Sequence, residues 1–124
     1  MELRVARHTQ DLKKIRHFYT HILGLTFLGS FEDHDSYSGI FLGLAGENWH
    51  LEFTISIEAP QHHGDPDDLL VFYSKSDEHY QSILERLEEN GIESLKSKNP
   101  YWDNHGAFIK DPDGFGIIIA KKRH

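Results

Sequence analysis

Apolar and polar residues follow one order along this chain, and that order occurs twice. An alternating apolar strand at Leu3–Arg7 precedes a helical pattern that ends at Gly24. A second apolar strand at Leu69–Ser74 precedes a helical pattern that ends at Gly91. Within each half the period changes from two to about 3.6 residues, which predicts a strand followed by an amphipathic helix. Repeated units bury their apolar faces by packing on one another, so we expect a cleft where they meet.

Short strands are predicted after each helix, separated by turns rich in Gly, Asn and Asp. The Asp-Pro-Asp-Gly segment at 111–114 predicts a tight turn, because proline presets φ and glycine accepts a positive φ. Thr9 and Ser76 are the expected N-caps of the two helices. The expected strands are Phe27–Phe31, Gly39–Leu44, Trp49–Ile57, Ile92–Leu95, Gly106–Lys110 and Phe115–Lys121.

These elements predict an α+β fold class of two repeated βαβββ modules that form a curved mixed sheet around a cleft. The first module is expected at residues 1–58 and the second at residues 68–124. Residues 59–67 are polar and rich in Pro, Gly and Asp, which is typical of a linker. Together the two modules make one domain of ordinary size.

Charge and composition narrow the class of partner. The chain has 13 Lys and Arg against 20 Asp and Glu, a net charge of −7, so we expect no nucleic-acid or membrane partner. No apolar run approaches the ~20 residues of a membrane span, and the start lacks a signal-peptide pattern, which favours a cytoplasmic location. The chain has no cysteine, which excludes disulfides, thiolate nucleophiles and cysteine zinc sites.

The order of strands, helices and turns resembles the vicinal oxygen chelate superfamily, which includes glyoxalase I, extradiol dioxygenases, fosfomycin-resistance proteins and bleomycin-resistance proteins. The resemblance covers nearly the whole chain. The chain is also similar to a Bacillus subgroup that has no assigned reaction. The shared segments are Arg-x-Ala-Arg near the start, His-Leu-Glu-Phe-Thr, and Asn-Pro-Tyr-Trp. The segments that carry the superfamily resemblance are Asp11-Leu12, Phe18-Tyr19, Leu23-Gly24-Leu25, Leu51-Glu52-Phe53 and Asp111–Gly114.

In the metal-dependent members of this superfamily, four inward strand positions hold a divalent ion beneath two substrate oxygens. The resemblance places these positions at Arg4, Glu52, Leu69 and Ile118. One carboxylate beside two aliphatic side chains cannot hold Zn²⁺, Mg²⁺, Fe²⁺ or Mn²⁺ tightly. We therefore expect no metal at the usual site and no cofactor. The Arg4 guanidinium can instead pair with Glu52 in place of the ion.

Two alternatives stay open for these polar residues. His50 and Glu52 share a strand face by alternation, and parity places His8 on the same face as Arg4. Two histidines and a carboxylate form a recognised ligand set, so a divalent metal at a shifted site of His8, His50 and Glu52 is one alternative. The other alternative is structural: the Arg4–Glu52 pair neutralises buried charge, and the histidines are hydrogen-bonded polar residues.

Aromatic and apolar residues complete the candidate ligand site. Tyr101 and Trp102 are expected in a polar loop, where they either cap the core or form one wall of a pocket. His105 is either a turn residue or a general base, and Tyr73 is in phase with Leu69 and is expected to line the cleft. The catalytic candidates are Glu52 and His50. The candidate ligand-binding residues are Arg4, His8, His50, Glu52, Leu69, Tyr73, Tyr101, Trp102, His105 and Ile118.

Three classes of function follow from these residues. The first is metal-independent binding of a small amphipathic or aromatic molecule, as the resemblance to the bleomycin-resistance branch implies. The second is an enzyme: a lyase, isomerase or dioxygenase with the shifted metal set, or a metal-free acid–base catalyst using Glu52 with His50. The third is an interaction module without ligand chemistry. The resemblance also implies a homodimer.

Overall fold

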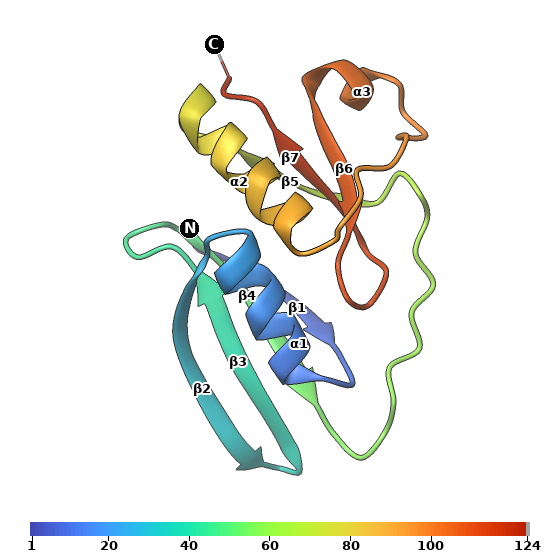
Figure 1. Ribbon diagram of the computed structural model, residues 1–124. Coiled ribbons are helices and arrows are strands. Elements are labelled where there is room, and N and C mark those ends of the chain that lie inside the picture. The colour runs from blue at the N-terminus through green and yellow to red at the C-terminus, as the bar shows by residue number, and fades with distance from the viewer. Residues whose placement is uncertain (124) are drawn as a thin grey trace. The chain divides into compact units, whose positions relative to one another are not determined.

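The computed structural model describes residues 1–123 and consists of two compact units, Met1–His62 and a second that begins at His63 (Figure 1). The boundary between the units falls inside the predicted linker at residues 59–67. Each unit has its own β-sheet with a helix on one face, so both halves of the chain have the α+β structure expected from the repeat.

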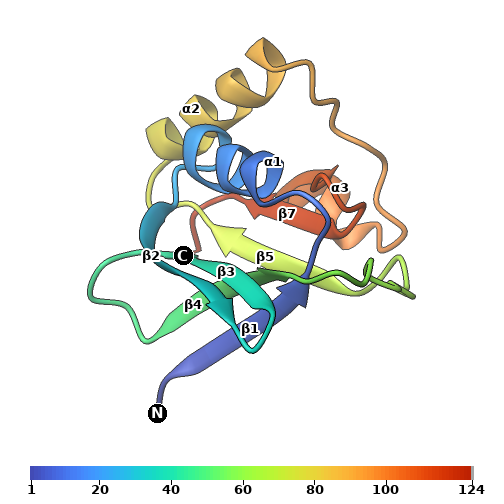
Figure 2. The same cartoon turned by 90° about the horizontal axis from the view of Figure 1, so that it is seen from below.

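The first unit is a four-stranded sheet in the order β1-β4-β3-β2, with β1 parallel to β4 and the other pairs antiparallel. Figure 2 shows α1 on one side of this sheet. Leu51 and Phe53 of β4 point to that side, where Tyr19 packs with its ring centroid 5.0 Å from that of Phe53. The elements are β1 (Leu3–His8), α1 (Leu12–Arg16), η1 (His17–Ile22), β2 (Thr26–His34), β3 (Tyr37–Gly43) and β4 (Trp49–Ile55).

The first helix begins and continues differently from its prediction. Asp11 is its N-cap, because the Asp11 carboxylate accepts a hydrogen bond from the Lys14 backbone N–H at 3.1 Å. Thr9, the predicted cap, is buried two residues earlier, and its hydroxyl accepts a hydrogen bond from the Asp11 N–H at 3.4 Å. After Arg16 the helix widens into the π-helix η1, in which Phe18 and Tyr19 are both buried.

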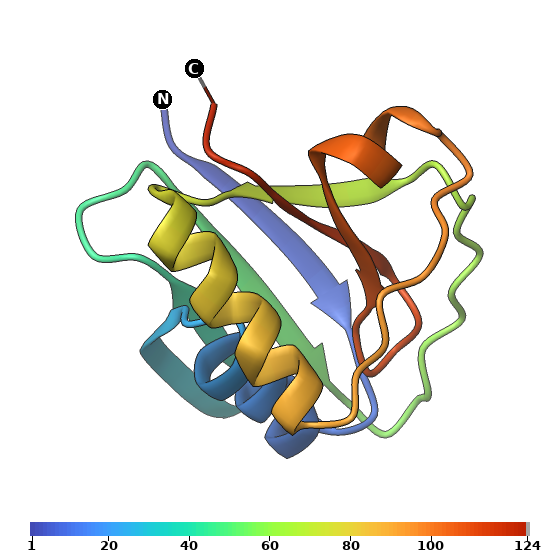
Figure 3. The same cartoon turned by 45° about the horizontal axis from the view of Figure 1, so that its top comes forward.

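The second unit has a three-stranded sheet in the order β5-β7-β6, with β5 parallel to β7 and β6 antiparallel to it. Helix α2 contacts β7, and its buried residues are Tyr80, Ile83 and Leu87. Ser76 caps the helix as predicted, because its hydroxyl accepts a hydrogen bond from the His79 N–H at 3.0 Å. Figure 3 shows the short helix α3 leading directly into β6. The elements are β5 (Leu69–Tyr73), α2 (Asp77–Glu89), α3 (Tyr101–His105), β6 (Gly106–Lys110) and β7 (Gly116–Ala120).

Two predicted segments of the second unit are different in the structure. The strand expected at Ile92–Leu95 is reduced to a single bridge between Leu95 and Phe108. Ile92 and Leu95 are three residues apart, so they would point to opposite faces of a strand and cannot both pack on one sheet face. Tyr101 and Trp102 lie in α3 and not in a loop; Pro100 precedes α3 with φ −65°, a value suited to a helix start.

The turn at 111–114 has the predicted geometry. The Asp111 carboxylate accepts hydrogen bonds from the backbone N–H groups of Asp113 at 2.9 Å and Phe115 at 3.0 Å. Gly114 has φ 88°, which a side chain would disfavour. The turn therefore connects β6 to β7 as the sequence predicts. Among residues 1–123, the helices are all too short or too polar to span a membrane.

Candidate functional site

The site residues of the first unit lie on the face of its sheet opposite α1, which we call the first open face. Strand register determines its membership. Arg4 of β1 is level with His50 of β4, and Glu52 of β4 is level with Phe41 of β3. Residues level with one another on paired strands point to the same side, so these four side chains share one face. The structure thus brings together Arg4, His50 and Glu52, three of the predicted site residues.

Arg4 is the centre of this group. Its Nε donates a hydrogen bond to His50 Nε2 at 2.8 Å, and its Nη1 lies 3.9 Å from Glu52 Oε2. The Arg4 Cζ lies 4.9 Å from the centroid of the Phe41 ring, within the range of a cation–π contact. The Arg4 side chain is 51% exposed and that of Glu52 is 16% exposed. A half-exposed cation therefore lies beside a largely covered carboxylate and an aromatic ring.

These contacts define the protonation states available to the group. Because Nε2 of His50 accepts the Arg4 hydrogen bond, the neutral His50 ring carries its proton on Nδ1. The Nε2 lone pair is then occupied and is not available to a metal or a substrate proton. The 3.9 Å separation between Arg4 and Glu52 is too long for a hydrogen bond. Glu52 thus presents carboxylate oxygens that accept no hydrogen bond from the described residues.

Two phenylalanines on the first open face were not among the predicted site residues. The Phe31 and Phe41 rings lie 5.8 Å apart, and Phe41 meets His50 edge-on at 6.0 Å. Gly39 makes room for Phe31, because a Cβ at Gly39 would lie 2.6 Å from Phe31 Cε1. The sequence signal for this patch is the alternation of Gly39, Phe41 and Gly43, in which two glycines leave one large ring uncovered on their side of the strand.

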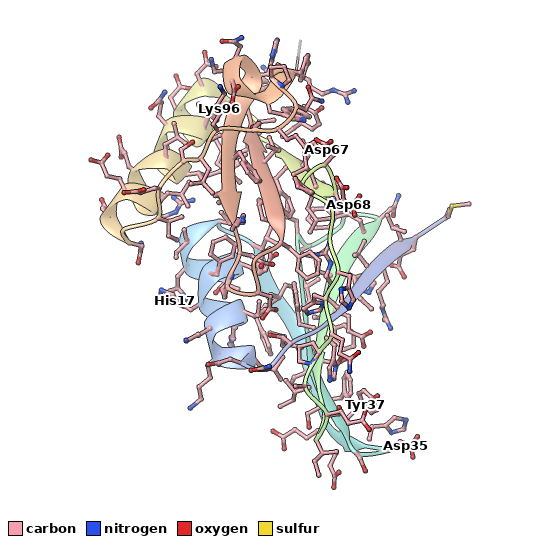
Figure 4. All side chains as sticks on the ribbon, turned by 90° about the vertical axis from the view of Figure 1, so that its right-hand side faces the viewer. His17, Asp35, Tyr37, Asp67, Asp68 and Lys96 are labelled. Atoms are coloured by element: carbon pink, nitrogen blue, oxygen red, sulfur yellow. The ribbon has the colours of Figure 1, made fainter. Side chains whose placement is uncertain are left out.

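His8 lies on the same sheet face but does not join this group. Its Nδ1 lies 2.7 Å from Thr54 Oγ1, and its Nε2 lies 3.0 Å from both Ser56 Oγ and the Glu58 carbonyl oxygen. Because a carbonyl only accepts, Nε2 carries a proton. Its ring is also 5.7 Å from that of Tyr37, which lies at the hairpin end of β3 (Figure 4).

The shifted metal set of His8, His50 and Glu52 is therefore not assembled. The parallel register places His8 beside Thr54, whereas Glu52 lies beside Ala6. The histidine is therefore two residues beyond the position level with Glu52. Within the described part of the chain, no three His, Asp or Glu side chains are close enough to hold a metal ion. Parity alone placed His8 on the correct face; the register separates it from Glu52.

The second unit presents an apolar cluster in the corresponding place. Phe108, Ile118 and Ala120 are buried together, and Leu69, Val71 and Trp102 pack against them. The predicted residues Leu69, Trp102 and Ile118 are thus brought together in this unit. Phe108 was not predicted, although it is level with Ile118 on the neighbouring strand and therefore points to the same side.

The remaining predicted residues lie at the edges of the second unit. Tyr73 is 46% exposed at the end of β5, with the Arg123 guanidinium 5.0 Å from its ring centroid. Tyr101 stacks on His105 with ring centroids 3.9 Å apart and planes 2° from parallel, and it meets Trp102 edge-on at 4.9 Å. His105 Nδ1 donates to the Tyr101 carbonyl at 2.7 Å, so its Nε2 is the nitrogen that remains for other contacts.

The architecture of both units defines the class of protein. In each unit the first strand is parallel to the last strand of the same sheet, a helix covers one face, and the site residues lie on the other. This is the fold of the vicinal oxygen chelate superfamily. Leishmania major glyoxalase I matches with a TM-score of 0.77 and 19% identity over 98% of this chain and 86% of that one. TnmS3, an antibiotic binding protein from Streptomyces sp. CB03234, matches with a TM-score of 0.69 and 17% identity over 99% and 96%.

Sequence comparison identifies the particular family within that class. Residues 3–54 match the YycE-like N-terminal domain, and residues 67–121 match the YycE-like C-terminal domain. The chain belongs to the YycE-like family. It is 38% identical over 125 residues to the uncharacterized protein YycE of Bacillus subtilis (strain 168), covering 98% of this chain and 88% of that protein. The crystal structure of YycE, a protein of unknown function, matches with a TM-score of 0.86 over 99% of this chain and 90% of that one.

The residues that the superfamily resemblance places at the metal positions do not fit a divalent ion. Leu69 and Ile118 have no donor atom, and both lie in the apolar cluster of the second unit. The Arg4 guanidinium carries only N–H donors and is positively charged. Glu52 alone could coordinate a metal, and His50 beside it already accepts a hydrogen bond from Arg4. This donor set is unsuited to Zn²⁺, Mg²⁺ or Fe²⁺, which require three or more protein or water ligands in defined geometry.

Proposed function

We propose that this protein binds a small amphipathic molecule with an aromatic or planar part, and that it does so without a metal ion. The observation that carries the proposal is the Arg4 group: a half-exposed guanidinium beside Phe41 and Glu52, at a position that the superfamily resemblance assigns to a metal ligand. Ligand sites combine apolar walls with a few polar groups that orient the guest. The first open face supplies both, with Arg4 and Glu52 as the polar groups and Phe41 as the apolar wall.

A ligand screen tests the proposal directly. Purified full-length protein is screened by thermal shift against amphipathic aromatic compounds of positive, negative and zero charge. Compounds that raise the melting temperature are then titrated by calorimetry. We expect saturable binding with one site per chain, weakened by Phe41→Leu and by Arg4→Met. The matched control is Glu85→Gln, an exposed change on α2 that should leave binding unaltered.

Two outcomes would overturn the proposal. One is a screen in which no compound of any charge stabilises the protein, which would favour the interaction module. The other is binding that is indifferent to both Phe41→Leu and Arg4→Met. Circular dichroism of each variant verifies that the fold is retained, so that lost binding is attributable to the site.

A second candidate function, metal-free proton transfer, is supported by the Glu52 carboxylate. It is 16% exposed and accepts no hydrogen bond from the described residues, which are conditions suited to a general base. Incubation with small carbonyl compounds in D₂O, followed by NMR, would detect exchange of the proton next to the carbonyl. Exchange that Glu52→Gln abolishes would support an enzyme; exchange equal to the buffer rate would exclude this activity for those compounds.

We also propose that the protein is a homodimer, which the fold resemblance supports. Size-exclusion chromatography with light scattering measures this directly. A mass near twice the 14.4 kDa of the chain is expected, and a single species at the chain mass would contradict it.

A further inference from the structure

The Arg4 guanidinium has hydrogen-bond donors that the protein leaves unused. A guanidinium carries five N–H groups, and the only hydrogen bond that the Arg4 guanidinium makes within residues 1–123 is from Nε to His50. Nη1 is 3.9 Å from Glu52, too far for a hydrogen bond, and Nη2 has no partner among the described residues. Nη1 and Nη2 together form the pair of parallel N–H groups that binds a carboxylate in a bidentate manner.

The Glu52 carboxylate, in turn, lacks hydrogen-bond donors among the described residues. Its side chain is 16% exposed, so much of its solvation is lost, yet no N–H or O–H of the described residues donates to it. A covered carboxylate is stabilised when it gains charge-assisted hydrogen bonds. An ammonium group from a ligand would supply them. Arg4 Nη1, at 3.9 Å from Glu52 Oε2, is too distant to supply one.

The spacing of the two charges limits which ligand can satisfy both. Arg4 Nη1 and Glu52 Oε2 are 3.9 Å apart, and His50 holds the guanidinium by its Nε. A ligand with an ammonium and a carboxylate on one carbon can place the carboxylate on Arg4 and the ammonium on Glu52, so that opposite charges are neighbours throughout. A ligand with a single charge would leave either Glu52 or the Nη groups of Arg4 without a hydrogen-bond partner from the ligand.

The apolar part of the same face indicates what the rest of the ligand is. Phe41 lies 4.9 Å from the Arg4 Cζ, and Phe31 lies 5.8 Å from Phe41. A planar group attached one or two bonds from the charged carbon would lie along these rings. Aromatic pairs in this arrangement add to the affinity beyond the area that they bury.

We infer that the first open face recognises the amino-acid group of an aromatic amino acid or of a molecule that carries one. Arg4 binds the carboxylate, Glu52 binds the ammonium, and Phe41 with Phe31 contacts the aromatic part. His50 is a positioning residue, because it holds Arg4 and does not itself meet the ligand's charges. The inference rests on the proposed function, since it names the class of small molecule that this site binds.

Calorimetry with four matched probes tests the inference on the full-length protein. L-phenylalanine carries all three groups, hydrocinnamate lacks the ammonium, phenethylamine lacks the carboxylate, and glycine lacks the ring. We expect L-phenylalanine to bind at least about tenfold more tightly than each of the other three, since losing a charged hydrogen bond or the buried aromatic ring weakens binding by about that factor. Equal affinity for hydrocinnamate and L-phenylalanine would overturn the inference.

Single substitutions assign each charge to its partner. Glu52→Gln should weaken L-phenylalanine about tenfold and leave hydrocinnamate unchanged, because only the ammonium contact is lost. Arg4→Gln should weaken L-phenylalanine and hydrocinnamate alike and leave phenethylamine unchanged. Glu85→Gln is the control for a lost surface charge. Glu52→Gln without effect on L-phenylalanine would contradict the assignment.

The failure of this inference can be told apart from failure of the proposed function. If none of the four probes binds but other aromatic compounds in the screen do, with dependence on Phe41, the inference is wrong and the proposed function stands. If no aromatic compound of any charge binds, both fail. Loss of binding in a variant counts only when its circular dichroism spectrum and melting temperature match those of the unaltered protein.

Discussion

The sheets of the two units are built on the same plan, and the faces that hold their predicted site residues carry opposite chemistry. In the first unit, the parallel strand pair β1 and β4 presents Arg4, His50 and Glu52, of which Arg4 is half exposed. In the second unit, the parallel pair β5 and β7 contributes Leu69 and Ile118 to an apolar cluster. One strand register can therefore support either a polar site or a packed patch. What differs is whether the side chains at those positions lose contact with water.

The largest loss of stability is expected when a charge is placed in the apolar cluster of the second unit. Ile118 is fully buried, so Ile118→Glu should lower the free energy of unfolding by at least about 3 kcal/mol, because the carboxylate would have no partner. Ile118→Val is the size-matched control and should cost only about 1 kcal/mol. Urea unfolding followed by circular dichroism measures both. If the two variants differ by less than about 1 kcal/mol, the apolar cluster of the second unit is not tightly packed.

The next effect comes from glycines that lie beneath large side chains on both faces. A Cβ at Gly39 would lie 2.6 Å from Phe31, and one at Gly116 would lie 2.7 Å from Leu69. Each change to alanine forces a neighbour to move and should cost about 1–3 kcal/mol. Gly64→Ala is the control, since its nearest contact would be 3.8 Å. If thermal unfolding finds all three alanine variants equally stable, the close contacts at Gly39 and Gly116 do not limit side-chain packing on these sheets.

A smaller change in stability is expected when the first open face receives apolar residues like those of the second unit's cluster. The double variant Arg4→Leu/Glu52→Ile removes a 3.9 Å ion pair whose arginine is half exposed. Such pairs contribute about 0–1 kcal/mol, so the free energy of unfolding should change by no more than about 1 kcal/mol. Binding of charged aromatic probes should be lost in the same variant. A large loss of stability would instead favour the structural role of the pair.

The smallest effect concerns the two helix starts, where Asp11 caps α1 and Ser76 caps α2. Beside Ser76, burial lowers the pKa of His79, with Lys75 and Arg86 acting in the same direction. The neutral His79 ring also accepts the Lys75 N–H at Nδ1, at 3.1 Å. Its contribution to stability is therefore present above the ordinary histidine pKa near ~6.5 and is lost as the pH falls below it.

His79→Gln should flatten that part of the pH dependence of the melting temperature between about pH 7 and pH 5. Asp11→Asn serves as the comparison at the first helix, where the capping hydrogen bond joins Asp11 to the Lys14 N–H and involves no histidine. A melting temperature that falls equally with acid in the unaltered protein and in His79→Gln would show that other groups carry the effect.

Much of the first site could be predicted from the sequence, because alternation is a local property of a strand. Arg4 and Glu52 were placed together from parity and from the resemblance, and they lie 3.9 Å apart. Phe31 and Phe41 were missed, since their exposure on this face depends on glycines across a hairpin. His8 was placed on the correct side but too close to Glu52, because parity does not determine register.

The sequence by itself determined the repeated α+β plan, the turn at 111–114, the Ser76 cap and the polar character of one half against the apolar character of the other. These depend on short-range φ preferences and on side-chain alternation, which residue order alone defines. The tertiary structure decided which residues meet. It places His8 beside Thr54 and reduces Ile92–Leu95 to one bridge. It also brings Arg4 into a hydrogen bond with His50, beside a largely covered Glu52. Those outcomes depend on register between distant strands, where packing and backbone pairing select one arrangement among several that local preference permits.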